Sequence, residues 1–309
     1  VDRAGLLQTL LGRSAFQITH AAYGEDVPPL PAGVELPISI YPWAYEKLIL
    51  KREVVAYSRL DDLPPEAKVD KQTWAEWGIR SNVNIPLSIG EPVDHVIAIN
   101  SVKSERVWPE ELIPRLRLLG EIFVNALERK QIRLQIEERL RFERLISNLS
   151  AAFVNLPLNE IDSEINKWLR SITEFFDVGR CSIGLFSKDQ NQFVRGFEYH
   201  LAEVEPAPES MSKEQMPWYT EQVIQGKPVV MNRVEDLPPE AEKEHQLCLA
   251  KGMKSLVSFP MVSRGRTIGS CALVSTRAER VWPEELVQRF RLISEVFSNA
   301  LERKQAEEA

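Results

Sequence analysis

The sequence lacks the features of membrane-spanning and nucleic-acid-binding proteins. None of its apolar runs approaches the roughly 20 residues that a membrane-spanning helix needs, and we expect no signal peptide at its start. The net charge is −7, which argues against a nucleic-acid surface because such a surface needs a basic face. With 44% hydrophobic and 27% charged residues, the sequence is typical of a soluble globular protein of about two domains.

Cysteine is scarce as well. The 309 residues include only Cys181, Cys248 and Cys271, all in the second half of the chain. An odd number of cysteines with no C-x-x-C pair matches no disulfide framework. We therefore expect reduced thiols in a cytoplasmic protein.

What the sequence does contain is a long internal repeat. Residues 104–131 and 278–305 are identical at 20 of 28 positions, at an offset of 174 residues, and the same offset aligns 62–67 with 236–241. Solenoid repeats are only about 20 to 50 residues long. The period therefore predicts two duplicated domains.

The two copies do not begin at the same point. Val1-Asp2-Arg3 aligns with Val178-Gly179-Arg180, and nothing ahead of Val1 corresponds to residues 142–177. We expect a fragment that starts inside or just before the first strand of its first domain. The expected parts are a first copy without its N-terminal helix, a connecting helix and a second copy: 1–131, 132–150 and 151–309.

Hydrophobic periodicity predicts the elements of the second copy. Their order is helix, strand, strand, helix, strand, helix, strand, strand, helix. Consecutive hairpins with helices between them indicate an antiparallel sheet with helices on its faces, an α+β fold. The predicted ranges are 159–176, 180–187, 192–199, 213–225, 228–231, 242–251, 254–263, 266–275 and 283–305.

The segment between the copies predicts one continuous helix. Between Arg115 and Leu156 only Gly120 interrupts a run without glycine or proline, so we expect about 40 helical residues. An apolar stripe on so long and polar a helix favours a homodimer through this segment. Pro114 replaces Gln288 of the second copy, and its missing N–H predicts a kink or a later helix start.

These features together resemble GAF domains, which are PAS-like sensory modules. The ending ERVWPEEL…NALERK is similar to the last strand and exit helix of GAF domains in bacterial sensor histidine kinases and related transcriptional regulators. The resemblance implies two domains, each with an antiparallel sheet of about six strands, a ligand cavity on one sheet face and signalling through the terminal helices. It implies the input module of a signal-transduction protein, such as a two-component system, and no enzyme.

The resemblance names no ligand for this chain. Members of the family bind cyclic nucleotides, haem, bilins, formate or 2-oxoglutarate, but neither copy has the N-K…F…D-E pattern or the Cys-His pair that identify the cyclic-nucleotide and bilin classes. Polar and aromatic residues at the expected pocket positions are candidate ligand-binding residues, although such aromatics also suit a plain core. They are Phe197, Tyr199, Trp218, Asn232, Ser258 and Cys271 in the second copy, and Trp43, Tyr57, Trp74, Asn82, Asn84 and Asn100 in the first.

Alternative functions are weaker. His245, Cys248 and Glu242 on one predicted helix face suggest a metal or haem site, but the first copy has Lys71, Trp74 and Lys68 there, so we expect no metal. No H-E-x-x-H, G-x-S-x-G, P-loop or G-x-G-x-x-G motif is present.

Two functional alternatives remain. A GAF pair with no small-molecule ligand would serve as a dimerising spacer. One branch of the family reduces free methionine sulfoxide with cysteines, and the three cysteines allow that activity. The first copy has none of the three: Ala4, Trp74 and Ile97 stand at the matching positions.

Overall fold

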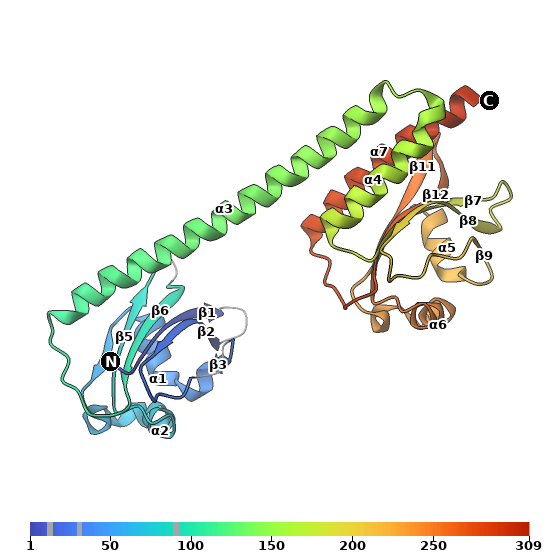
Figure 1. Cartoon of the computed structure of the whole chain (residues 1–309). Helices are drawn as coiled ribbons and strands as arrows, with labels where there is room; N and C mark the ends of the chain where they lie inside the picture. The colour runs from blue at the N-terminus through green and yellow to red at the C-terminus, as the bar shows by residue number, and fades with distance from the viewer. Residues whose placement is uncertain (11–14, 30–32, 89–92, 309) are drawn as a thin grey trace. The chain divides into compact units, whose positions relative to one another are not determined.

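The computed structural model describes residues 1–10, 15–29, 33–88 and 93–308. It divides into two compact units, Val1–Glu137 and Glu138–Ala309. Each unit contains one antiparallel sheet of six strands (Figure 1). The boundary between the units falls inside the long helix α3, Leu112–Val154.

The two sheets have the same strand order. The first runs β3-β2-β1-β6-β5-β4, and the second, read from the matching edge, runs β9-β8-β7-β12-β11-β10. This confirms the expected shared architecture. The first-unit strands are β1 Arg3–Leu10, β2 Ala15–Tyr23, β3 Glu35–Pro37, β4 Val55–Tyr57, β5 Ser81–Leu87 and β6 His95–Ser101. Those of the second unit are β7 Arg180–Phe186, β8 Gln192–His200, β9 Ser210–Ser212, β10 Val229–Met231, β11 Ser255–Ser263 and β12 Arg266–Ser275.

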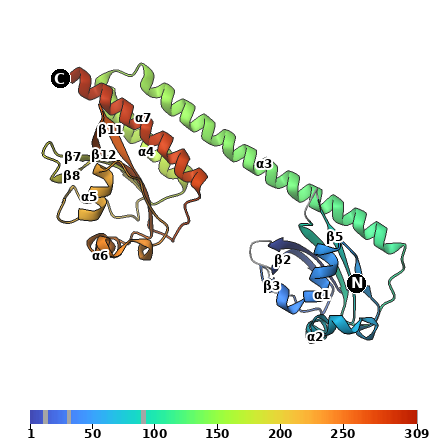
Figure 2. The same cartoon turned by 180° about the vertical axis from the view of Figure 1, so that it is seen from behind.

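Helices cover both faces of the second sheet. Helices α4 (Ile161–Phe176) and α7 (Glu284–Glu308) pack along one face, while α5 (Pro217–Ile224) and α6 (Glu242–Ala250) lie over the other (Figures 1 and 2). Apolar residues recur every three or four positions along α4 and therefore lie on one face of the helix. That face is buried against the core. The core between these helices and the sheet includes Phe176, Phe290 and Phe297, none of which is more than 1% exposed.

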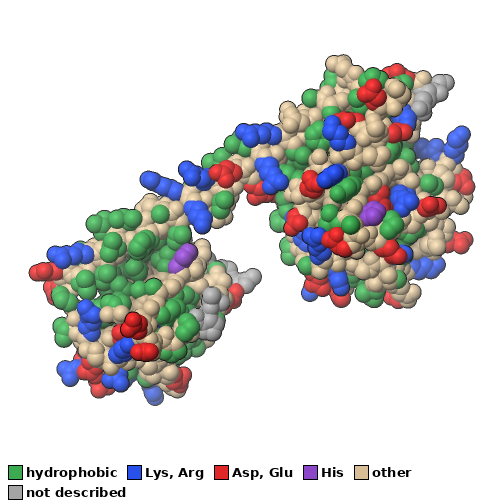
Figure 3. All heavy atoms as spheres, in the orientation of Figure 1, with side chains coloured by type: hydrophobic (Ala, Val, Ile, Leu, Met, Phe, Trp, Pro, Cys, Tyr) green, Lys and Arg blue, Asp and Glu red, His purple; other side chains and the backbone are tan. Residues whose placement is uncertain are grey.

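The first sheet has one covered face and one partly covered face. Helices α1 (Pro42–Tyr45) and α2 (Lys68–Glu76) lie over the face that corresponds to the α5 and α6 side. On the other face, the start of α3 packs on β5 and β6 through Val124 and its neighbours. Among the described residues of this unit no second helix accompanies α3. Hydrophobic side chains are therefore exposed on this unit (Figure 3), Phe123 among them.

Two details of the second unit correct the expectation from sequence. The predicted helix at 213–225 begins only at Pro217, whose ring favours the first helical position. The residues ahead of it include the short strand β9, which pairs with β8 and was not predicted. Its sequence, Ser-Met-Ser, contains no β-branched or aromatic residue, unlike the equally short β10 (Val-Val-Met), which was predicted.

Helix α3 confirms the expected continuous helix and the effect of Pro114. The helix has 43 residues. It begins at Leu112, two residues after the position that aligns with the start of α7, and is preceded by a turn in which Leu112 N donates to Pro109 O at 2.9 Å. Pro114 is then the third helical residue, where a missing N–H breaks no intrahelical bond. No helix among the described residues is long and apolar enough to cross a membrane.

Candidate functional site

A bulge in β8 decides which of its side chains face the candidate site. In the pairing of β7 with β8, Ile183 lies opposite Phe197 and Gly184 opposite Arg195, so Gly196 has no partner. An extra residue in one strand reverses the alternation of its side chains. Arg195 and Phe193 therefore point to the α5 and α6 face, whereas Phe197 and Tyr199 point to the α4 and α7 core.

A cavity of about 120 Å³ lies on the α5 and α6 face of the second sheet. Most of its wall is apolar, with Trp218, Leu256 and Val274 among the lining residues. Four of the five methionines of the chain also line it. Methionine side chains adapt their shape to irregular contents, so this wall suits an apolar ligand body. The four are Met211, Met216, Met231 and Met253.

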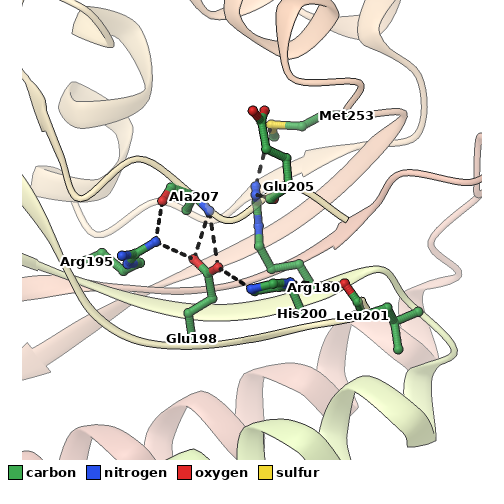
Figure 4. A network of polar contacts seen from close by, with 8 residues as sticks. All are labelled: Arg180, Arg195, Glu198, His200, Leu201, Glu205, Ala207 and Met253. Carbon is green, nitrogen blue, oxygen red and sulfur yellow. Dashed lines mark hydrogen bonds and ion pairs between the residues drawn. The ribbon is translucent and has the colours of Figure 1, made fainter. Parts of the chain in front are cut away.

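Arg180 places a positive charge in this apolar wall. Its side chain is 7% exposed, and one guanidinium nitrogen donates to the carbonyl oxygen of Glu205 at 3.1 Å, while another approaches the sulfur of Met253 at 3.9 Å (Figure 4). Its Nε has no hydrogen-bond partner among the described residues. Burial lowers the pKa of Arg180, and the nearby charge of Glu198 opposes that shift. A buried guanidinium without a paired carboxylate is costly and attracts an anionic group.

Glu198 lies close to the second arginine of the cavity, Arg195. Its carboxylate accepts a hydrogen bond from the backbone N–H of Ala207 at 3.0 Å and lies 3.9 Å from both Arg195 and His200 (Figure 4). Arg195 also donates to the carbonyl oxygen of Ala207 at 2.5 Å. Arg195 is therefore held by local partners, whereas the Nε of the buried Arg180 has no partner in the described part of the chain.

Tyr219 and Glu244 close the other side of the cavity. The Tyr219 hydroxyl bonds to the hydroxyls of Ser258 and Ser270 at 2.7 and 2.8 Å, and burial raises its pKa. The Glu244 carboxylate accepts from the backbone N–H of Tyr219 at 3.0 Å, which caps the start of α5. Its other oxygen has no partner among the described residues.

The first unit has a cavity of about 80 Å³ on the equivalent face of its sheet. Arg3, which aligns with Arg180, lines this cavity, and its Nε is also without a partner in the described part of the chain. Asn82, Asn84 and Asn100 line it too. Its apolar side contains Trp74 and other aromatic rings.

The structure brings only one of the six second-copy candidates into the cavity wall. Trp218 lines the cavity, and Ser258 lies beneath Tyr219. Phe197, Tyr199 and Cys271 belong to the opposite core, the first two because of the bulge at Gly196. Asn232 has a structural contact, because its Oδ1 accepts a 2.8 Å hydrogen bond from the backbone N–H of Trp282.

The first-copy candidates are brought together more closely. Trp74, Asn82, Asn84 and Asn100 all line the cavity. Tyr57 is buried beside it, with its ring 5.0 Å from that of Trp74, and Trp43 packs at the edge of the same core.

Sequence reasoning missed the arginines. Arg3 and Arg180 align between the copies, and a charged residue inside a predicted buried strand is unusual, so this pair carried a usable signal. The lining methionines and Glu244 gave no comparable signal, because methionine is an ordinary core residue and glutamate an ordinary helix residue.

The surroundings of the cysteines disfavour a reactive thiol. All three are buried. Burial raises the pKa of Cys248 to about 11 and raises that of Cys181 well above its usual range. Since the thiolate is the reactive form, this disfavours the reductase alternative. No group of three or more potential metal ligands occurs in the described ranges.

Comparisons with known proteins concern the second unit most directly. Residues 160–301 match the family model of the GAF domain. The chain is 25% identical over 203 residues to the formate hydrogenlyase transcriptional activator of Salmonella typhimurium, a match that covers 62% of this chain and 29% of the relative. The chain therefore spans less than a third of the length of the curated relatives it matches.

Similar solved structures are more distant. The phycocyanobilin-bound GAF domain from a cyanobacterial phytochrome has a TM-score of 0.47 and 16% identity, covering 54% of this chain and 96% of that one. The free methionine-R-sulfoxide reductase of Neisseria meningitidis has a TM-score of 0.44 and 12% identity, covering 54% and 91%. The match to the family model places a GAF domain at residues 160–301 of this chain.

Proposed function

We propose that this chain is the sensory input module of a bacterial signalling protein and that the cavity of its second unit binds a small anionic molecule with an apolar body. The observation that carries the proposal is the position of Arg180, a buried guanidinium with an unused donor in a methionine-rich wall. The GAF match and the similarity to a transcriptional activator support a sensory role.

The size of the cavity narrows the ligand class. The 120 Å³ cavity is many times larger than the roughly 10–15 Å³ that one water molecule needs, so it has room for a ligand of several non-hydrogen atoms. Formate, which the name of the relative contains, would leave most of this space empty. Medium-length or aromatic carboxylates fit it better.

The same strands connect the cavity to the helices. In β12, Ala272 and Val274 line the cavity, while Cys271 and Leu273, which alternate with them, pack in the core with α4 and α7. A ligand that shifts these strands therefore also shifts the core surface on which α4 and α7 pack. Arg303 of α7 donates to the carbonyl oxygen of Phe153, at the end of α3, at 2.7 Å.

Ligand titration tests this proposal. Native mass spectrometry of the purified chain, followed by calorimetry with formate, hexanoate and phenylacetate, should give saturable binding of a longer carboxylate to one site. Arg180→Met should weaken that binding at least tenfold, while Arg291→Met, a change at an exposed arginine of α7, should not. Binding that is indifferent to Arg180→Met, or no bound carboxylate at all, contradicts the proposal and favours a spacer without a ligand.

We also propose that α3 forms a homodimer. Leu118, Ile122, Ile132 and Ile136 are between 46% and 60% exposed, and at about 100° per residue they fall within about 80° of the helix circumference. With Asn125 and Arg129 they complete the alternating four- and three-residue spacing of a coiled-coil seam. The sheet-facing residues of α3, including Val124, lie on the opposite side.

Light scattering of the whole chain at micromolar concentration tests the dimer. Wild type should have the mass of two chains, and Ile132→Glu with Ile136→Glu should give a monomer. Leu134→Glu is the matched control, because Leu134 is equally exposed but lies off the seam. A wild-type monomer, or a double variant that remains dimeric, refutes the proposal.

A further inference from the structure

The first unit contains a row of polar side chains on the cavity face of its sheet. Arg3 on β1 lies opposite Asn100 on β6, which lies opposite Asn82 on β5, which in turn lies opposite Tyr57 on β4. Directly paired residues on neighbouring strands point to the same face. Four hydrogen-bonding side chains therefore follow one another across the sheet, and Asn84 lines the same cavity one step along β5.

These polar groups are buried and largely unsatisfied. Asn82 is 1% exposed, and Arg3 and Asn84 are each 8% exposed. The Oδ1 atoms of Asn82, Asn84 and Asn100 and the Nε of Arg3 have no hydrogen-bond partner among the described residues. An unsatisfied buried polar group typically costs about 1–3 kcal/mol, so four of them in one cavity need an explanation.

The second unit shows that the fold itself does not need this row. There the equivalent row reads Arg180, Val274, Leu256 and Met231, in the same register across β7, β12, β11 and β10. Apolar side chains thus fill three of the four positions without changing the strand order. The sheet consequently does not require the polar row of the first unit, and these side chains are available to hydrogen-bond with a molecule in the cavity.

We infer that the cavity of the first unit binds a small carboxylate that also carries N–H or O–H donors, the chemistry of α-amino acids and α-hydroxy acids. The Arg3 guanidinium offers its free donor to the carboxylate. The three asparagine carbonyl oxygens accept from the donors, and an ammonium group has three. Trp74 and Trp77 line the same cavity, and indole faces attract a cation.

The size of the cavity agrees with this class. The 80 Å³ cavity is smaller than the 120 Å³ cavity of the second unit but well above the roughly 10–15 Å³ that one water molecule needs, so the smallest members of the class, such as glycine, alanine or serine, are the preferred candidates. The inference is independent of the proposed site in the second unit, because different residues in a different cavity carry it.

Calorimetry on the whole chain tests the inference with matched probes. L-Alanine and L-serine should bind at one site per chain, and propionate, which keeps the carboxylate but has no donor, should bind at least tenfold more weakly. L-Lactate distinguishes the two candidate ligand classes. If it binds more weakly than alanine, the site is assigned to α-amino acids; if it binds equally or more tightly, the site is assigned to α-hydroxy acids. Propionate binding as tightly as alanine overturns the inference.

A double variant locates the site. Asn82→Leu with Asn100→Val installs the residues of the second unit, so the sheet should still fold, and thermal unfolding checks this. It should weaken binding of the best probe at least tenfold, whereas Asn166→Leu, at an exposed asparagine of α4, should leave it unchanged. Unaltered binding in the double variant, or no saturable binding of any probe up to roughly 10 mM, far weaker than a specific site, overturns the inference.

Discussion

The two units build the same sheet but fill its cavity face differently. In the first, Arg3 is followed across the sheet by two asparagines and a tyrosine; in the second, Arg180 is followed by valine, leucine and methionine. The arginine is common to both, and the rest of the row is not. The scaffold and the contents of the cavity have thus diverged separately, which is expected where backbone pairing holds the sheet and side chains select the ligand.

The largest expected effect comes from moving the polar row into the second unit. Leu256→Asn with Val274→Asn removes two buried apolar side chains and buries two amides in a wall with few acceptors. We expect a loss of at least about 4 kcal/mol in the free energy of unfolding. Urea denaturation, with hydrogen exchange to assign the transition to the second unit, measures it.

The reverse exchange sharpens the comparison. Asn82→Leu with Asn100→Val removes unsatisfied groups, so without ligand the first unit should be unchanged or more stable by about 1–2 kcal/mol. A loss of stability similar to that of the second-unit exchange would show that the polar row supports the fold. The contrast between the units would then be structural and not a matter of ligand selection.

A glycine on β12 predicts a smaller difference in stability between alanine variants of the two units. A Cβ at Gly269 would lie 2.0 Å from the carbonyl oxygen of Gly184 and 2.9 Å from the Cα of Leu185, both backbone atoms. Gly269→Ala should therefore cost about 1–3 kcal/mol. The first unit has His95 at the aligned position. His95→Ala should change the free energy of unfolding by less than about 1 kcal/mol. Equal losses in the two variants, measured by urea denaturation, would contradict this prediction.

The smallest expected difference concerns the acid that caps the first helix over each cavity. Asp70 accepts from the backbone N–H groups of Trp43 and Ala44 at 3.2 and 2.8 Å, whereas Glu244 has a single donor, Tyr219, among the described residues. Asp70→Ala should cost about 2 kcal/mol and Glu244→Ala about 1 kcal/mol. A larger loss in Glu244→Ala would reverse the comparison.

Asp70 also predicts a pH dependence. Burial raises the pKa of Asp70 above its usual value, more than its backbone hydrogen bonds lower it. The folded state then holds the proton to a higher pH than the unfolded state does. The contribution of Asp70 to stability therefore falls as the pH rises from near 4 through the folded pKa. Unfolding curves between pH 4 and 7 should have a flatter pH dependence in Asp70→Ala than in wild type.

The fold was largely predictable from the sequence because its signals are long. The repeat predicted two sheets with one topology, the run without proline predicted α3, and Pro114 predicted the later start of that helix. The short strand β9 was not predictable, since Ser-Met-Ser has none of the β-branched residues that identified the equally short β10. Phe197 and Tyr199 were misplaced for a different reason. One unpaired residue, Gly196, reverses the side-chain alternation, and such a bulge depends on pairing across strands.

The site was predictable only where its residues differ from an ordinary core. The asparagines of β5 and β6 are unusual inside buried strands, and they line the first cavity. In the second unit methionine, leucine and valine line the cavity, and the same residues would fill a solid core. Only the pairing register and the cavity distinguish the two cases.

The unbroken α3 has a consequence for how its sequence can change. Each residue advances a helix by 1.5 Å and turns it by about 100°, so α3 has a rotational phase that every residue between Ile122 and Ile132 shares. An insertion of one residue there would turn the rest of the exposed stripe out of line, whereas an insertion of seven would restore its alignment almost completely. If α3 pairs with a second copy as proposed, the length of this segment is constrained in steps of a heptad, whereas side chains away from the seam can vary.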